Sequence, residues 1–179
     1  MRKTFAAILA ITGVLWFSTV QTRETKQYNE NTVSYSSLNK KTQAQVECLA
    51  QNVYFEAGYE KPQGQMAVAL VTLNRAEANG NPQNICGVVK ERTETVCQFT
   101  WWCDASLRDK AIHQRFTPRE KEVYNQVKKV ALYTYLNYEN IVDVTKGAMF
   151  YHATYVNPRW KYKKTVQIGN HIVDRKSTR

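Results

Sequence analysis

The sequence predicts a single α+β domain that is mainly helical and ends in a small β element. Three observations carry this prediction. Apolar residues recur at helical spacing in segments between residues 42 and 131, and short stretches after residue 147 have the composition of strands. With 179 residues, 43% hydrophobic and 22% charged, the chain has material for one globular core rather than two.

The first two helices are expected to form a hairpin. Apolar residues at helical spacing place the first helix over residues 42–57, and Gly58 follows where a left-handed cap would end it. Pro62 suits the first turn of a second helix, whose apolar stripe ends at Asn79-Gly80.

The rest of the domain alternates between irregular and regular segments. A helical turn is expected over residues 85–90, followed by an irregular loop over 93–104. The clearest helix begins at Thr117-Pro-Arg-Glu120, which combines an N-cap, a proline at the first position and a capping-box glutamate. A strand is expected over 148–152, and two short strands within 165–173 surround a Gly-Asn turn.

The N-terminus predicts export. Arg2 and Lys3 precede an apolar run over residues 5–17, the arrangement of a secretion signal. Residues 18–23 lack a clean pair of small residues for signal peptidase, and the apolar run is slightly short for a transmembrane helix even when extended to Val20. A cleaved signal and an uncleaved signal anchor in the inner membrane therefore both stay open, and both lead to the periplasm or cell envelope.

The expected organisation has three parts. Residues 1–22 form the signal peptide or signal anchor. Residues 23–41 are polar and rich in Asn, Thr, Ser and Gln, which predicts a linker. The folded domain is expected over residues 42–179.

The net charge of +10 predicts attraction to a polyanion. From residue 159 onward Lys and Arg outnumber the single acid Asp174 seven to one: Arg159, Lys161, Lys163, Lys164, Arg175, Lys176 and Arg179. A solvated basic face is the alternative interpretation. Because export argues against nucleic acid, we expect an anionic cell-wall polymer as the partner of this C-terminus, and the membrane as a partner of the N-terminal segment if it is uncleaved.

The four cysteines predict disulfides rather than a metal site. Cys48, Cys86, Cys97 and Cys103 are an even set in an exported domain, so two disulfides are expected, with three pairings open. No Cys-x-x-Cys pair exists, and His113, His152 and His171 are not spaced as ligands from one helix. We expect neither a metal nor another cofactor.

The densest chemistry lies at the end of the first predicted helix. Glu56 sits in the last turn beside Tyr54 and Phe55, where the helix dipole and desolvation both favour the protonated carboxyl and raise its pKa. Such a group suits general acid catalysis of glycosidic cleavage. An exposed glutamate near a helix end is the alternative. Glu60 is expected to be structural or substrate-positioning rather than catalytic, and Asp104 to be a turn residue.

Several ordered blocks resemble the SleB/CwlJ-type cell wall hydrolase family. The blocks cover the predicted domain from Val46 to Val173, and their order is more specific than any one motif. They are Glu56-Ala-Gly-Tyr-Glu60, then residues 64–75, 82–89, 98–101 and 147–152, Trp160, and Ile168-Gly-Asn-His171.

The resemblance implies a lysozyme-like catalytic domain acting on peptidoglycan, with the family's essential glutamate at Glu56. The family includes spore-cortex lytic transglycosylases and relatives in phages, so phage-induced host lysis by an endolysin is one implied role. One departure concerns the loop: the usual Glu-Ala-Arg-Gly-Glu is Glu-Ala-Gly-Tyr-Glu here, which moves the glycine and loses the arginine.

Two reactions and one non-catalytic role stay open. A lytic transglycosylase needs one carboxyl, because the muramic acid C6 hydroxyl attacks the anomeric carbon, whereas attack by water makes the enzyme a muramidase. A non-catalytic cell-wall-binding module is the alternative. The residues that we expect to contact substrate are polar or aromatic: Glu60, Asn74, Gln98, Trp101, Tyr151, His152 and Trp160. Core packing is at least an equal alternative for Gln98, Trp101, Tyr151 and Trp160, and a structural role is the alternative for His152.

Overall fold

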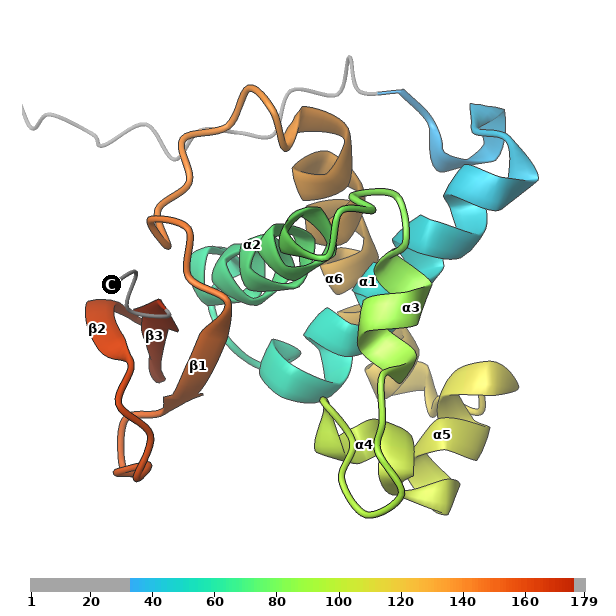
Figure 1. Cartoon of the computed structure of the whole chain (residues 1–179). Helices are drawn as coiled ribbons and strands as arrows, with labels where there is room; N and C mark the ends of the chain where they lie inside the picture. Colours follow the sequence, from blue (N-terminus) through green and yellow to red (C-terminus); the bar gives the residue numbers. More distant parts are fainter. Residues whose placement is uncertain (1–32, 176–179) are drawn as a thin grey trace, which may run out of the picture. The chain divides into compact units, whose positions relative to one another are not determined.

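A computed structural model describes residues 33–175 of the chain (Figure 1). Within these residues six α-helices and a three-stranded antiparallel sheet form a mainly helical α+β fold, which confirms the predicted fold class. The expected signal or anchor segment lies outside the described residues, as does the linker up to residue 32. In the described range, no helix is long and apolar enough to cross a membrane.

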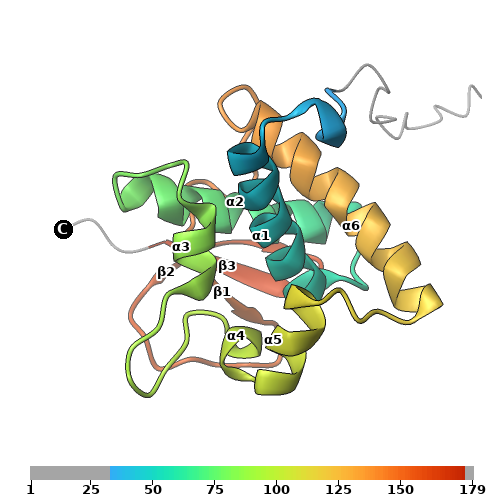
Figure 2. The ribbon, with the colours of Figure 1, turned by 90° about the vertical axis from the view of Figure 1, so that its right-hand side faces the viewer.

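Helix α1 (Lys40–Ala57) lies at the centre of the core. It packs against α2 (Pro62–Ala78), α3 (Ile85–Lys90) and α6 (Pro118–Asn137), and Figure 2 shows α1 and α6 side by side. Its N-terminus is capped by the Asn39 side chain, which accepts from Thr42 N at 2.9 Å. The apolar stripe predicted from the sequence is buried: Val46, Leu49, Ala50, Val53, Tyr54 and Ala57.

The expected left-handed cap at Gly58 is wrong. Gly58 has right-handed helical angles, φ −56° and ψ −33°. Glycine is needed there for space, because a Cβ at Gly58 would lie 2.4 Å from the Tyr54 carbonyl oxygen. This close approach lets the chain leave α1 and turn at once toward α2.

The segment after α3 is more regular than expected. The predicted irregular loop contains α4 (Thr100–Cys103), and an unpredicted helix α5 (Ala105–Ile112) follows directly. Asp104 separates the two, because its side chain accepts from the N–H groups of Ser106 and Leu107 and caps α5. The expected turn residue is therefore a helix cap.

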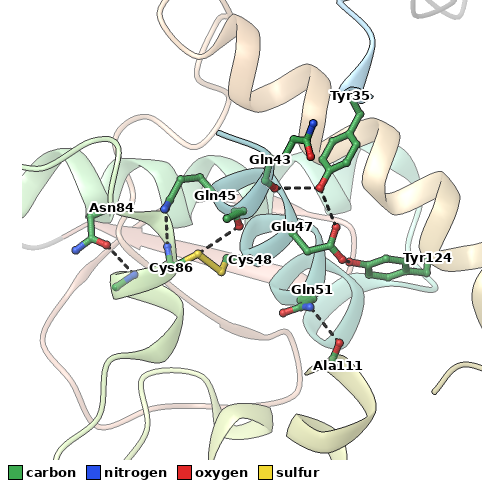
Figure 3. The surroundings of a disulfide bond; sticks show 12 residues. Tyr35, Gln43, Gln45, Glu47, Cys48, Gln51, Asn84, Cys86, Ala111 and Tyr124 are labelled. Atoms are coloured by element: carbon green, nitrogen blue, oxygen red, sulfur yellow. Dashed lines mark hydrogen bonds between the residues drawn. A yellow bond between two sulfur atoms is a disulfide. The ribbon is translucent and has the colours of Figure 1, made fainter. Parts of the chain in front are cut away.

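Both disulfides form. Cys48–Cys86 joins α1 to α3, and Cys97–Cys103 closes the short loop that leads into α4. Figure 3 shows the first bond and, on the adjoining turn of α1, the Glu47 carboxylate that accepts hydrogen bonds from Tyr35 and from Tyr124 on α6.

Helix α6 begins where its capping signal predicts. Thr117 Oγ1 accepts from Glu120 N at 3.3 Å, while Thr117 N donates to Glu120 Oε2 at 2.9 Å. The reciprocal capping box is thus complete, with Pro118 at the first helical position.

The sheet contacts α2. Its strands are β1 (Phe150–Ala153), β2 (Lys163–Ile168) and β3 (His171–Arg175), in the antiparallel order β1-β3-β2. The predicted hairpin is confirmed, with Gly169 at φ +60° in the turn between β2 and β3.

Candidate active site

The end of α1 opens into a cavity of about 390 Å³. Both carboxylates of the sequence motif, Glu56 and Glu60, line it. The remaining lining residues come from the same segment, from α5 and α6, and from the turn between β2 and β3: Tyr54, Phe55, Ala57, Gly58, Tyr59, Leu107, Lys110, Glu120 and Asn170.

Glu56 is the penultimate residue of α1, beside aromatic side chains. The ring of Phe55 stacks on Trp101 with centroids 4.6 Å apart, and it meets Tyr54 edge-on at 5.1 Å. Burial raises the pKa of Glu56 above its ordinary value, and Tyr151 opposes this shift. The carboxyl therefore keeps its proton at a pH where an exposed glutamate has lost it.

Tyr151, on β1, approaches Glu56 from the sheet. Although the residue as a whole is half-buried, its hydroxyl has no exposed surface. The contact with Glu56 is looser than a well-formed hydrogen bond, because no group of residues 33–175 meets hydrogen-bond geometry with this hydroxyl. Burial, followed by the charge of Glu56, raises the pKa of Tyr151 well above its ordinary value, so the phenol keeps its proton.

Glu60 connects the α1–α2 loop to the β2–β3 turn. Both of its carboxylate oxygens lie 3.3 Å from Asn170 N, and Oε1 lies 3.3 Å from His171 Nδ1. From α2, Gln65 Nε2 donates to the carbonyls of Gly58 and Glu60 and holds this loop in place. Burial lowers the pKa of His171, against the attraction of Glu60, so burial favours the neutral imidazole.

One rim of the cavity carries an ion pair that the sequence analysis missed. Lys110 Nζ on α5 lies 2.6 Å from Glu120 Oε1 on α6. The hydrogen bond from Lys110, together with those from Thr117, lowers the pKa of Glu120 to about 2. Burial, then the charge of Glu120 and the neighbouring Tyr59, raises the pKa of Tyr54 to about 12.

Two of the residues that we expected to contact substrate form hydrogen bonds with other groups of the protein instead. Trp101 is 3% exposed, and its indole N–H donates to Asn52 Oδ1 at 3.0 Å. Asn74 Nδ2 donates to three oxygens of the segment 143–148, and its Oδ1 accepts from Tyr138 at 2.7 Å. Neither side chain lines the cavity.

Three further expected contacts also lie outside the cavity lining. Gln98 is exposed on the loop before α4. Trp160 is 40% exposed, beside Phe150 and Tyr162. His152 is buried, with Nε2 3.4 Å from Oδ2 of the fully buried Asp174. Of the expected substrate residues, only Glu60 lines the cavity.

The site residues missed by sequence reasoning come from distant segments. Leu107 and Lys110 lie on the unpredicted helix α5, and nothing in their local sequence indicates a site. A signal did exist for Asn170, since it belongs to the block Ile168-Gly-Asn-His171 on which the family resemblance partly rests.

Comparison with known proteins identifies one family. A family model described as Cell Wall Hydrolase matches residues 59–173. The match includes Glu60, Tyr151 and the β2–β3 turn, and it begins three residues after Glu56. Neither a curated protein nor a solved structure matches the chain significantly.

Proposed function

Because the chain belongs to the cell wall hydrolase family, whose role is peptidoglycan hydrolysis, we propose that it cleaves the glycan strand with Glu56 as general acid and base. The observation that carries this proposal is the protonated state that burial favours for Glu56 in a cavity at the end of α1. A buried carboxyl that keeps its proton can deliver it to a leaving oxygen.

The reaction begins with proton transfer from the Glu56 carboxyl to the oxygen that joins MurNAc C1 to the next sugar. The C1–O bond breaks, and its electron pair stays on the protonated leaving oxygen. The C6 hydroxyl of the same MurNAc then attacks C1, and its proton passes to the Glu56 carboxylate. The products are a 1,6-anhydro end and a free hydroxyl, and Glu56 is protonated again.

The arrangement of the other carboxylates favours this transglycosylase reaction over hydrolysis. Glu60 accepts a hydrogen bond from Asn170 N, and Glu120 is held by Lys110 and Thr117. Apart from Glu56, no carboxylate in the cavity lining is left without such partners to activate water. A muramidase remains the second candidate, in which Glu56 itself activates water after the leaving sugar departs.

The test is digestion of purified peptidoglycan followed by mass spectrometry. We expect muropeptides with 1,6-anhydro ends, lighter by one water than the reducing ends that a muramidase leaves. Glu56→Gln should lower turnover by at least about 100-fold with the fold retained, while the exposed Glu122→Gln on α6 should match the wild type.

The same assay separates an enzyme from a wall-binding module. Wall binding without any cleavage by the wild type would refute catalysis, and substantial turnover by purified Glu56→Gln would refute the role of Glu56.

We further propose that the N-terminal segment tethers the exported domain to the inner membrane, as in phage endolysins with a signal anchor. The apolar run over residues 5–20 is diluted by Thr12, Gly13 and three alanines, and the basic end should stay cytoplasmic. N-terminal sequencing tests this: an intact Met1 in the membrane fraction supports the tether, and a mature chain that starts after Val20 refutes it.

A further inference from the structure

Arg75 is a buried cation that forms no direct ion pair within residues 33–175, although the charge of Glu91 raises its pKa against the effect of burial. The residue lies on α2 and is 8% exposed, yet among residues 33–175 no carboxylate forms an ion pair with it, and its guanidinium donates no hydrogen bond. Arginine is almost never buried unless it is paired, because the charge loses its hydration. Its presence inside the domain therefore calls for an explanation.

Two aromatic faces hold the guanidinium. Its carbon lies 4.9 Å from the ring centroid of Phe150 and 5.6 Å from that of Phe99. Cation–π contacts of this kind stabilise a charge without neutralising it. Burial lowers the pKa of Arg75, but an arginine side chain remains protonated in proteins. The full positive charge is thus fixed beside β1.

Tyr151 follows Phe150 on β1 and is subject to two opposite charges. Next to the dominant effect of burial, Glu56 raises the pKa of Tyr151 and Arg75 lowers it. The Tyr151 hydroxyl itself is buried without a well-formed hydrogen bond. A buried hydroxyl in this state is uncommon in folded proteins and suggests that its partner changes during function.

We propose that Tyr151 and Arg75 are positioning residues that stabilise the Glu56 carboxylate formed when the proton has left. This inference rests on the proposed function. Once the Glu56 proton moves to the glycosidic oxygen, a negative charge appears in a desolvated place. Tyr151 keeps its own proton and donates a hydrogen bond to that carboxylate, while the Arg75 charge polarises the hydroxyl and strengthens this bond.

The other ionisable groups around the cavity are placed differently. Lys110 and Glu120 pair with each other, Glu60 Oε1 lies 3.3 Å from His171 Nδ1, and the charges of Glu91 and Tyr162 act on Arg75. Tyr54 and Tyr59 complete the titratable lining. The pKa of Glu56 responds to burial and to Tyr151.

The main test is Tyr151→Phe, which removes only the hydroxyl. Loss of the group that lowers the pKa of Glu56 should raise that pKa, so the alkaline limb of the pH profile moves to higher pH. At the pH optimum kcat should fall about 10- to 100-fold, the equivalent of one hydrogen bond to a charged group, with KM nearly unchanged. The 89% exposed Tyr155→Phe is the matched control and should leave kcat, KM and the pH profile unchanged.

The role of Arg75 is tested by substitutions that remove or keep its positive charge. Arg75→Met should resemble Tyr151→Phe, whereas Arg75→Lys should recover much of the lost rate, because Lys restores a positive charge. The double variant Arg75→Lys with Tyr151→Phe should lower kcat no further than Tyr151→Phe alone, because Arg75 acts through the Tyr151 hydroxyl. If Arg75→Met fails to fold, the Arg75→Lys single and double variants still test this coupling.

A readout independent of activity separates this inference from the proposed function. Carbon-13 labelling of glutamate carboxyls, with Glu56→Gln to assign the signal, gives the Glu56 pKa directly by NMR. A higher Glu56 pKa in Tyr151→Phe supports the inference even if wild-type protein cleaves no peptidoglycan, an outcome that would refute the proposed function alone. An unchanged Glu56 pKa, or a rise in KM with kcat unchanged, would overturn the inference.

Discussion

The Glu60 carboxylate lies 3.3 Å from the backbone nitrogen of Asn170, a residue 110 positions later in the chain. This contact joins the loop after the Glu56 helix to the turn between β2 and β3, where His171 Nδ1 lies 3.3 Å from Glu60 Oε1. The two sides of the cavity are therefore fixed relative to each other by a charge-assisted hydrogen bond. Its geometry depends on Gly64 and Gly169, where a Cβ would lie 2.4 Å and 2.1 Å from Glu60 Oε2.

The first prediction concerns Gly169. Its φ of +60° disfavours any other residue, and a Cβ there would lie 2.1 Å from Glu60 Oε2. Gly169→Ala should therefore displace the Glu60 carboxylate, destabilise the domain and reduce glycan cleavage. Gly80→Ala is the matched control, because Gly80 has φ +72° with nothing within 4 Å of its Cβ position. Gly80→Ala should lower the free energy of unfolding by only about 1 kcal/mol, because alanine disfavours this backbone angle. If urea unfolding showed the same loss of stability in Gly169→Ala and Gly80→Ala, the steric contact with Glu60 would be contradicted.

The second prediction is the pH dependence of activity. A general acid works only while it is protonated, so activity is lost as pH rises through its pKa. Because burial raises the pKa of Glu56, activity should persist to a pH above the ordinary glutamate range before it declines. Initial rates on soluble glycan fragments across pH measure this limb. A decline centred at or below the pKa of an exposed glutamate would count against Glu56 as the acid.

The third prediction concerns stability. A raised pKa means that the folded state holds the Glu56 proton more tightly than the unfolded state, so this contribution is fully present below the unfolded pKa and is lost as pH rises through the folded pKa. Glu56→Gln removes the charge, so its Tm should exceed that of the wild type at neutral pH. The difference should vanish in acid. Thermal unfolding at both pH values checks this, and a lower Tm for Glu56→Gln at neutral pH would show that the carboxylate stabilises the fold.

The fourth prediction concerns the basic C-terminal cluster. Its described members Arg159, Lys161, Lys163, Lys164 and Arg175 are all exposed. We expect them to attract an anionic wall polymer, so that binding to intact walls weakens as salt increases. Lys161→Gln with Lys163→Gln should reduce both the affinity and its salt dependence. The exposed pair Lys121→Gln with Lys129→Gln on α6 is the charge-matched control. Salt-independent binding, or equal losses in the two pairs, would refute this role.

Local signals in the sequence were sufficient to predict most of the regular structure. The capping box at Thr117, the proline at the start of α2 and the Gly-Asn turn each act through groups within a few residues, so their positions follow from short segments. The position of Glu56 at the end of α1 belongs to the same class, because the periodicity of one helix determines it. Its catalytic role stays a prediction.

Only the tertiary structure decided what surrounds Glu56. Lys110, Glu120 and Asn170 reach the cavity from segments more than fifty residues away, and the buried hydroxyl of Tyr151 faces Glu56 from the sheet. The pairing of the cysteines was likewise open until the helices packed, and the left-handed cap predicted at Gly58 was wrong. The physical reason is range: caps and periodicity depend on neighbours along the chain, whereas desolvation and charge pairing depend on which distant side chains the close-packed core brings together.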